Sequence, residues 1–347
     1  MPSRPFAIVC VVGPLLCVLF AVAVAVTDDP ATRVEITSLA LLTSGAIAAV
    51  AAYRRMRVTR VPRRRKAWFS VTLGLCLGVL ANLLGVVLDA LELTSSFSGL
   101  VDALLMSALL VCIIALSLFP PTPRRGTDLA RLIMDGLVVG GSVLFLANVM
   151  LFPTLLAEHD TTLLAQVQVL ALPVLDLVIT TLATLLIARS GSTSRTPLLL
   201  TGVAFLFYAI SDLAYAVNMS LGATPLGSWW DLGWLVGYLL ATLAALHPNA
   251  GKQPEAGALE AGALRSSIVF FTIFLIATAS SMIVSTVGAL DLTARIVWGV
   301  LILTVVARQL VLVIDNEQLR RSLEERVLER TKELREITNQ NELLLSS

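Results

Sequence analysis

Long apolar runs, separated by short polar breaks, occupy most of the chain. The runs are continuous rather than alternating, which favours membrane-spanning helices over a β-barrel. At about 1.5 Å per residue, such a run crosses roughly 30 Å of hydrocarbon as a helix. The pattern predicts an all-α fold, a polytopic membrane helix bundle of about ten spans, with roughly eight or nine crossings as the alternative. The predicted spans are Phe6–Val26, Ile36–Tyr53, Trp68–Leu91, Phe97–Phe119, Leu132–Phe152, Leu163–Ala188, Pro197–Val217, Trp229–Leu246, Ile268–Val287 and about Leu292–Ala307.

The composition agrees with this prediction. Of the 347 residues, 57% are hydrophobic and 14% are charged. A soluble domain has about 45–50% apolar and about 25% charged residues, so an ordinary soluble globule and a disordered chain are both excluded. The net charge of +1 creates no global field that attracts nucleic acid. The lipid bilayer is therefore the expected partner.

Basic residues gather in alternate polar breaks, with Arg33 and Arg295 as exceptions on the opposite side. The positive-inside rule places the basic breaks in the cytoplasm. We therefore expect a multi-pass protein of the cell membrane with both termini cytoplasmic. The basic breaks contain Arg54, Arg55, Arg57, Arg60, Arg63, Arg64, Arg65, Lys66, Arg124, Arg125, Arg131, Arg189, Arg195, Lys252 and Arg265.

The spans and breaks divide the chain into segments. An alternative for the first run is a cleaved signal peptide, because Arg4 precedes it and small residues lie near its end. The run is longer than the roughly 7–15 apolar residues of a usual signal peptide. The segments are the first two spans (1–53), a basic cytoplasmic loop (54–66), spans three to six (67–188), spans seven to ten (189–314) and a cytoplasmic coiled-coil connector (315–347).

Polar landmarks recur at a nearly constant spacing, which indicates a parallel four-span repeat of spans three to six in spans seven to ten. Coincidence among Leu-, Ala- and Val-rich helices is the alternative. The landmark pairs are Arg65 and Arg195, Asn82 and Asp212, Asp102 and Asp231, and Pro120 and Pro248.

Aspartates lie inside the predicted spans, where a charge costs roughly 2.5–3.5 kcal/mol on insertion scales and normally faces protein or water. Spans seven and eight each carry an aspartate and two aromatic residues at helical spacing, so each set shares one face. We expect the two faces to meet at similar depth, either as a structural polar clamp or as an aromatic and acidic ligand pocket open to the outside. The candidate residues are Asp89, Asp102, Tyr208, Asp212, Tyr215, Asp231, Trp234 and Tyr238.

Simpler roles compete with the pocket at the start of span eight. Trp229, Trp230 and Trp234 are placed to form an interfacial aromatic belt, and Asp231 to cap the helix. Asp176 lies near the middle of span six and Asp135 in the inner part of span five, so these two carboxylates also need partners.

Cysteine and histidine spacing argues against a metal centre. His159 and His247 lie far apart, and the adjacent residues Glu158-His159-Asp160 are too local to converge on one ion. The chain contains none of the common nucleotide-binding or hydrolase motifs. We therefore predict no metal site, no cofactor and no catalytic residue in this chain. The cysteines, which lie in apolar runs without a C-x-x-C partner, are Cys10, Cys17, Cys76 and Cys112.

The last residues read DNEQLRRSLEERVLERTKELREITNQNELLLSS, which is highly charged and free of Gly and Pro. Strong helix formers dominate, and no breaker separates them from span ten. A heptad pattern predicts a marginal parallel coiled coil, and hence a homodimer; a solvated single helix is the alternative. The predicted seam consists of Leu323, Val327, Leu334, Ile337, Asn341 and Leu344.

The stretch RVLERTKELREITNQNELLLSS resembles the connector before a PAS domain in bacterial sensor proteins, where an E-R-T-x-E-L run precedes the first PAS residues. The membrane part, with its segment WWDLGWLVGYLLATLAALHP, resembles the multi-span input module of bacterial GGDEF–EAL proteins, which make and break cyclic di-GMP. The same connector type also precedes histidine kinases. The resemblance implies PAS, GGDEF and EAL domains after the connector, so we expect this chain to be a fragment.

The favoured function is a membrane sensory module that relays a stimulus, such as an unknown small extracellular ligand, through the coiled coil to an output domain. The full-length protein would then be a diguanylate cyclase and phosphodiesterase, or a histidine kinase. The alternative is a transporter or channel that uses the intramembrane Asp residues. A membrane-embedded enzyme is a third interpretation, which no motif supports.

Overall fold

The computed structural model describes residues 4–119, 178–183, 192–220, 226–250, 274–282 and 298–314, together with single residues and pairs of residues between 134 and 331. Every regular element in this part of the chain is helical, which confirms the all-α class. The helices are α1 (Arg4–Val26), α2 (Pro30–Val58), α3 (Pro62–Ala90), α4 (Thr94–Leu118), α8 (Ser192–Ser220), the 3₁₀ turn η1 (Trp229–Asp231) and α9 (Leu232–Leu246).

Within the described residues six helices are long and apolar enough to cross a membrane, not the ten predicted. They coincide with the first four predicted spans and with the seventh and eighth. A shorter apolar helix, Trp298–Ile314, overlaps the tenth predicted run. The predicted spans Leu132–Phe152, Leu163–Ala188 and Ile268–Val287 lie mainly outside the described residues. The chain is therefore a multi-pass membrane helical protein by the length and apolarity of its helices.

Several helices extend beyond the apolar runs because polar residues cap them. At the start of α2, Pro30 follows Asp29, whose side chain accepts a 2.9 Å hydrogen bond from the Thr32 amide. Proline suits the first turn of a helix because its missing N–H would have no partner there. Pro62 begins α3 in the same way. Most of the basic segment 54–66 is therefore helical, and only residues 59–61 separate α2 from α3.

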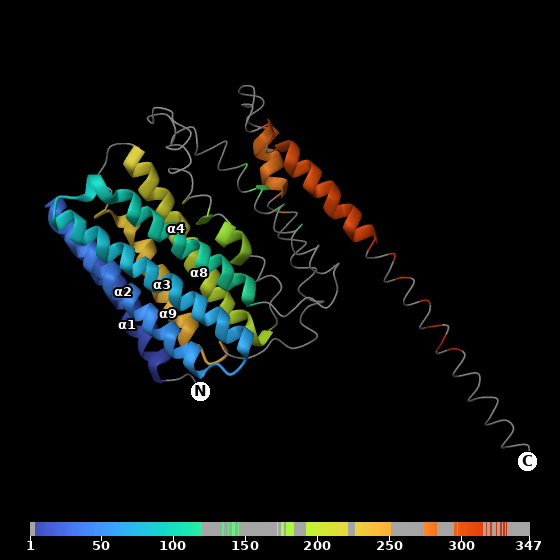
Figure 1. Cartoon of the computed structure of the whole chain (residues 1–347), viewed down its shortest axis with the longest axis horizontal. Coiled ribbons are helices and arrows are strands. Elements are labelled where there is room, and N and C mark those ends of the chain that lie inside the picture. The colour runs from blue at the N-terminus through green and yellow to red at the C-terminus, as the bar shows by residue number, and fades with distance from the viewer. Residues whose placement is uncertain are drawn as a thin grey trace, which may run out of the picture.

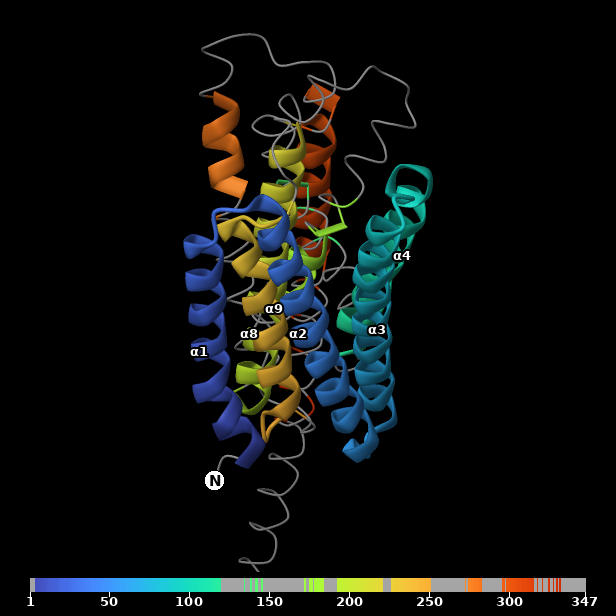
Figure 2. The same cartoon turned by 90° about the vertical axis from the view of Figure 1, so that its left-hand side faces the viewer.

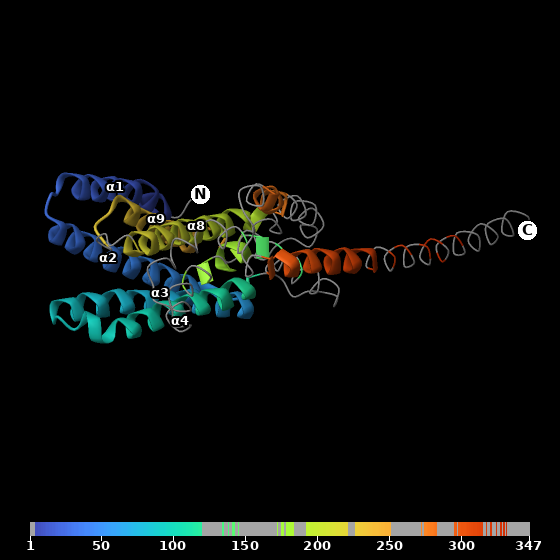
Figure 3. The same cartoon turned by 90° about the horizontal axis from the view of Figure 1, so that it is seen from above.

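Helix α9 lies at the centre of the bundle and contacts α8, α2 and α1, whereas α3 contacts α2 and α4 (Figures 1 and 2). Half of the residues in the membrane-spanning window of α9 are buried, against 22% for α3 and for α4. The helix Trp298–Ile314 lies beyond α4 and α8, on the far side of the bundle from α1 (Figures 1 and 3). The outer helices thus expose apolar surface that a bilayer would cover.

Arginines at one end of the bundle bind the carbonyl ends of neighbouring helices. Arg55 donates to the carbonyl oxygens of Ala245 at 2.5 Å and His247 at 2.7 Å, just where α9 ends. Likewise, Arg63 donates to the Leu118 carbonyl at the end of α4, at 3.1 Å. The last carbonyls of a helix lack partners and carry partial negative charge, so a guanidinium stabilises them. Part of the basic segment therefore holds the helices together.

The opposite end of the bundle explains one exception in the charge pattern. Arg33 donates a hydrogen bond to the carbonyl oxygen of Thr27, the residue that follows α1. The arginine therefore has a structural role at this end of the bundle. Gly227, before η1, lies against Arg33 with a φ of +89°. A side chain there would be strained and would collide with Arg33, so glycine is required. The described helices thus place 54–66 and the 226–231 turn at opposite ends, as the alternating topology predicts.

Candidate functional site

The helices α8 and α9 pack closely because two glycines of α9 face α8. A Cβ atom on Gly233 would lie 3.0 Å from the carbonyl oxygen of Phe207, and one on Gly237 would lie 3.2 Å from that of Ala204. The same two atoms would collide with the side chains of Ser211 and Tyr208. Without side chains at these positions, the polar faces of the two helices come into direct contact.

The structure brings the two predicted faces together. The indole nitrogen Nε1 of Trp234 donates a 2.6 Å hydrogen bond to Oδ1 of Asp212. The rings of Tyr208 and Tyr238 meet edge to face with centroids 5.1 Å apart, and those of Tyr215 and Trp234 lie 6.0 Å apart. Such aromatic pairs contribute about 0.5–1.5 kcal/mol beyond their area burial. The two faces therefore contact each other along the α8–α9 interface.

Asp231 caps its own turn. Its Oδ2 accepts hydrogen bonds from the amides of Gly227 (2.7 Å) and Ser228 (2.9 Å), and its Oδ1 accepts one from the Ser228 hydroxyl (3.1 Å). The residue is only 2% exposed. Asp212 and Asp231 thus have separate partners. Asp231 forms a capping box with Ser228 on the 3₁₀ turn, and its side chain makes no capping hydrogen bond to α9 itself.

Asp102 joins this group, but Asp89 does not. Asp102 on α4 is half-buried and, with Asp212 and Asp231, lies within electrostatic range of Tyr215. Asp89, near the end of α3, is exposed. The sequence predicted a similar depth for Asp89 and Asp102. Their different burial follows from how α3 and α4 pack against their neighbours.

Tyr238 is fixed by residues that the sequence did not mark as site residues. Its ring carbon Cζ would lie 3.1 Å from a Cβ on Gly45 of α2, and its hydroxyl oxygen would lie 3.6 Å from one on Gly78 of α3. The side chain of Asn82 is within hydrogen-bonding range of the Tyr238 hydroxyl. Gly45 and Gly78 could have pointed to these contacts in the sequence, because a glycine inside a span often marks a place where two helices pack closely. Tyr238 therefore links α9 to both α2 and α3.

A second carboxyl group, that of Asp176, lies close to the carboxyl group of Asp212. It is 3% exposed, and the two side chains lie within hydrogen-bonding range of each other. One turn further along, Ile179 packs with Cys112 and Leu116 of α4 in a buried cluster. The sequence placed Asp176 in the middle of a span but offered no means to choose its partner.

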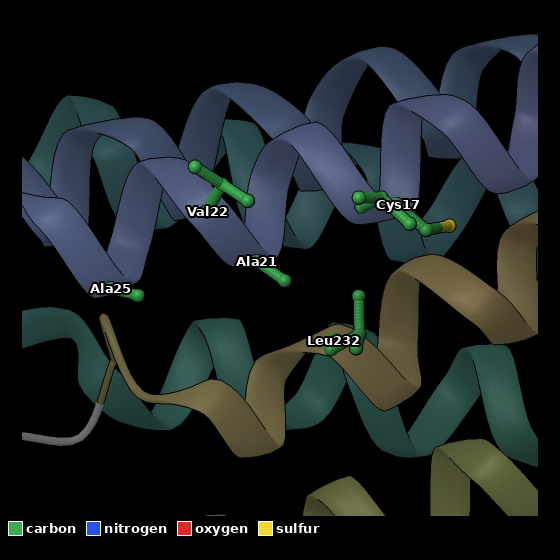
Figure 4. A pocket seen from close by; sticks show the side chains of 6 residues that line it. Cys17, Ala21, Val22, Ala25 and Leu232 are labelled. Carbon is green, nitrogen blue, oxygen red and sulfur yellow. The ribbon is translucent and has the colours of Figure 1, made fainter.

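The site is packed rather than open. Trp234, Tyr238 and Asp231 are 9%, 4% and 2% exposed, so little of these side chains faces outward. The polar clamp and the ligand pocket both stay predictions. A groove of about 320 Å³ lies elsewhere, between α1 and α9 (Figure 4). Its lining is entirely apolar, and a groove of that kind at the bundle surface suits lipid chains. It is formed by Cys17, Val18, Ala21, Val22, Ala25 and Leu232.

Outside the spans, the surroundings of two titratable groups shift their pKa values. Hydrogen bonds from Thr32 lower the pKa of Asp29 below its ordinary value. Burial and the nearby positive charge of Arg55 lower the pKa of His247, whose Nδ1 accepts a 3.1 Å hydrogen bond from the Asn249 amide. His247 is therefore held neutral beside the arginine that binds the end of α9.

Comparison with protein-family models, with curated proteins and with solved structures finds no match for this chain. Within the described residues, no group of three or more His, Cys, Asp and Glu side chains is arranged to hold a metal ion. The contacts of the site join α8, α9, α2 and α3 through buried polar side chains.

Proposed function

We propose that this chain is a membrane sensory and signal-transmission module that passes a change in its helix bundle to an output domain through its C-terminal helix. The observation that carries the proposal is that the apolar helix Trp298–Ile314 is followed by described residues that are helical and mostly charged, at 317, 320, 324, 327, 329 and 331. A helix that is anchored in a bundle and projects from it can transmit rotation or a register shift.

The inner part of this helix is anchored by buried aromatic contacts. The Trp298 ring lies 4.9 Å from Phe145 and 6.1 Å from Phe274, between ring centroids. One turn later, Leu301 is 2% exposed and packs against Val138. A movement of the surrounding helices would therefore act directly on this helix, since packed cores do not deform continuously.

The outer part has the features of a solvated helix with an unpartnered apolar position. Arg320 Nε lies 3.6 Å from carboxylate oxygens of both Glu317 and Glu324, the spacing of ion pairs on one helix face. Val327, a predicted seam residue, is 65% exposed in the single chain. Pairing with a second copy would cover it, as the heptad predicts. The other seam residues, Leu323, Leu334, Ile337, Asn341 and Leu344, lie outside the described residues.

The resemblance to GGDEF–EAL input modules suggests the output. Under this proposal the C-terminal helix leads to PAS and cyclic di-GMP domains or to a histidine kinase, and the termini lie in the cytoplasm. The catalysis then belongs to those domains rather than to this chain.

A fusion tests the proposal. We would join a diguanylate cyclase domain after Ser347 and measure cyclic di-GMP in cells. Deleting two residues between Arg321 and Thr331 rotates the following helix by about 200°, whereas deleting seven leaves it about 20° from its original phase. The two-residue deletion should lock or abolish the output and the seven-residue deletion should largely preserve it. Equal effects would show that the helix is a passive tether.

One observation favours a second candidate, a transporter or channel. Asp176 is 3% exposed inside the bundle, and its Oδ2 has no hydrogen-bond partner among the described residues. Carboxylates of this kind mark ion and proton pathways in many membrane proteins. Flux through proteoliposomes that contain the chain distinguishes the candidates, since a sensory module should carry none.

A further inference from the structure

Two carboxyl groups from different helices meet in the interior of the bundle. Asp212 comes from α8, and Asp176 comes from the helical residues 175–183, which are described in part. The side chains of Asp176 and Asp212 lie within hydrogen-bonding range of each other, so the second segment lies against α8. Ile179 and Ala183 of that segment pack with Cys112, so it also lies against α4. Helix α9 completes the arrangement through the Trp234–Asp212 hydrogen bond.

Among the described residues, the groups that surround the two carboxyl groups are uncharged. The groups that act on the pair or lie nearby are Cys112 of α4, Tyr208 of α8 and Tyr238 of α9, which are ordinarily protonated and uncharged at neutral pH. In the part of the chain that the structure describes, no Lys, Arg or His side chain acts on either carboxyl group. Two ionised carboxylates within hydrogen-bonding range would repel each other strongly in an apolar interior.

The close approach of the two carboxyl groups favours a proton over a metal ion. Two carboxyl groups hydrogen-bond each other only when one of them carries a proton, because an ionised carboxylate has no donor. Trp234 already directs its N–H group at Oδ1 of Asp212, so one of the oxygens that a cation would use accepts a hydrogen bond instead. The described residues also hold no cluster of three or more ligands suited to a metal ion.

We propose that Asp176 and Asp212 form a proton-binding site in the bundle, in which Asp176 carries one proton and donates a hydrogen bond to Asp212. Asp212 then accepts two hydrogen bonds, from Asp176 and from Trp234, so a single proton links α8, α9 and the segment that packs on α4. Removing the proton would place two like charges between these helices. The inference does not depend on the proposed signalling role, because it concerns the protonation of the chain itself.

Infrared difference spectroscopy of the full chain in lipid nanodiscs tests the site, in buffer free of sodium and potassium. We expect the carbonyl band of a protonated carboxylic acid at neutral pH, with a shift in D₂O and a second shift after labelling with isotopic aspartate. Asp176→Asn should remove the band. Asp212→Asn should keep it at a different frequency, since a neutral amide becomes the acceptor. Asp89→Asn, at an exposed position, should leave it unchanged.

Two results would overturn the site. One is a wild-type spectrum without a protonated aspartate band at neutral pH. The other is a band that neither Asp176→Asn nor Asp212→Asn alters. If sodium or potassium changes the ionised carboxylate bands of the pair, the ligand is an alkali cation and the proton assignment is wrong. Asp176→Asn keeps the volume and an N–H donor toward Asp212, so the variant should fold; the aspartate-labelled wild type provides a reading that needs no variant.

Discussion

The hairpin formed by α3 and α4 and the hairpin formed by α8 and α9 have the same outline but different surroundings. Each is an antiparallel pair of helices with a glycine at the contact, and each carries one member of three predicted landmark pairs. In the α3–α4 hairpin, Asn82 and Asp102 are half-buried and Asp89 is exposed. In the α8–α9 hairpin, the corresponding Asp231 is 2% exposed and fully hydrogen-bonded.

The difference follows from position in the bundle. Helix α9 is surrounded by α1, α2 and α8, so its polar groups must find partners inside the protein. Helices α3 and α4 turn one side outward and expose residues such as Leu83 and Ile114, at 47% and 54%. Similar landmarks therefore serve different purposes: they are packed hydrogen-bonding groups in one hairpin and partly exposed groups in the other.

The largest expected effect comes from a methyl group placed at the contact of each hairpin. In Gly237→Ala the new Cβ collides with the Tyr208 ring and approaches a backbone oxygen to 3.2 Å, which should cost about 1–3 kcal/mol. In Gly74→Ala the Cβ meets the sulfur of Cys112 at 2.8 Å and the Ala108 oxygen at 3.1 Å. The sulfur can rotate away, so we expect a smaller loss.

Thermal unfolding in detergent measures both losses. The matched control is Gly85→Ala on α3, where a Cβ would meet nothing within 4 Å. This control should be neutral or stabilising, since alanine is the better helix former. Equal destabilisation by Gly74→Ala and Gly237→Ala would contradict the contrast between the hairpins.

A second comparison uses one tryptophan from each hairpin. Trp234→Phe removes the hydrogen bond to Asp212, whereas the indole N–H of Trp68 has no partner among the described residues. Both substitutions remove similar volume from buried positions. We expect Trp234→Phe to cost about 1–2 kcal/mol more than Trp68→Phe in the free energy of unfolding, because a hydrogen bond to a carboxylate is lost. Chemical denaturation gives the difference, and equal costs would show that the bond contributes no net stability.

The third comparison uses the aspartates that the predicted repeat relates. Asp231→Ala removes a carboxylate that accepts from two backbone amides, so it should cost about 1 kcal/mol. Asp102→Ala should stay within about 0.5 kcal/mol, as is usual for partly exposed positions. Melting temperatures of the two variants test this order. A larger loss from Asp102→Ala would indicate that α4 is more deeply packed against Tyr215 than its exposure implies.

The smallest effect concerns pH at the end of α9. The pKa of His247 is lowered from an ordinary value of 6.5, so the folded protein prefers the neutral ring. The unfolded state then binds more protons below about pH 6.5, and stability is lost as the pH falls from there through the folded pKa. His247→Gln should remove this part of the acid dependence, and Arg55→Gln should raise the pKa of His247. A histidine chemical shift titration by NMR measures the pKa, and a value that does not move in Arg55→Gln would contradict the proposed charge effect.

Local chemistry accounts for the positions of the spans. Apolar length alone placed the six helices to within several residues, and helical spacing placed Tyr208 and Asp212 on one face and Trp234 and Tyr238 on another. The helix ends were less well predicted, because capping by groups such as Asp29 carries α2 into polar sequence. The four-span repeat and the cytoplasmic location of the termini remain predictions, and the alternative of a cleaved signal peptide stays untested.

The sequence by itself determined which segments are helical, because apolar stretches must become helices in a bilayer. It also determined which side chains share a helix face, because an α-helix has 3.6 residues per turn. The tertiary structure decided the partners. Arg55 binds the end of α9 across 190 residues of sequence, and Asp212 meets Asp176 rather than Asp231 as its nearby carboxyl group. Hydropathy and helical period are local properties, whereas the pairing of buried polar groups depends on which helices lie side by side. That choice is made by packing between distant segments, at glycines such as Gly45 and Gly237 where two helices can approach.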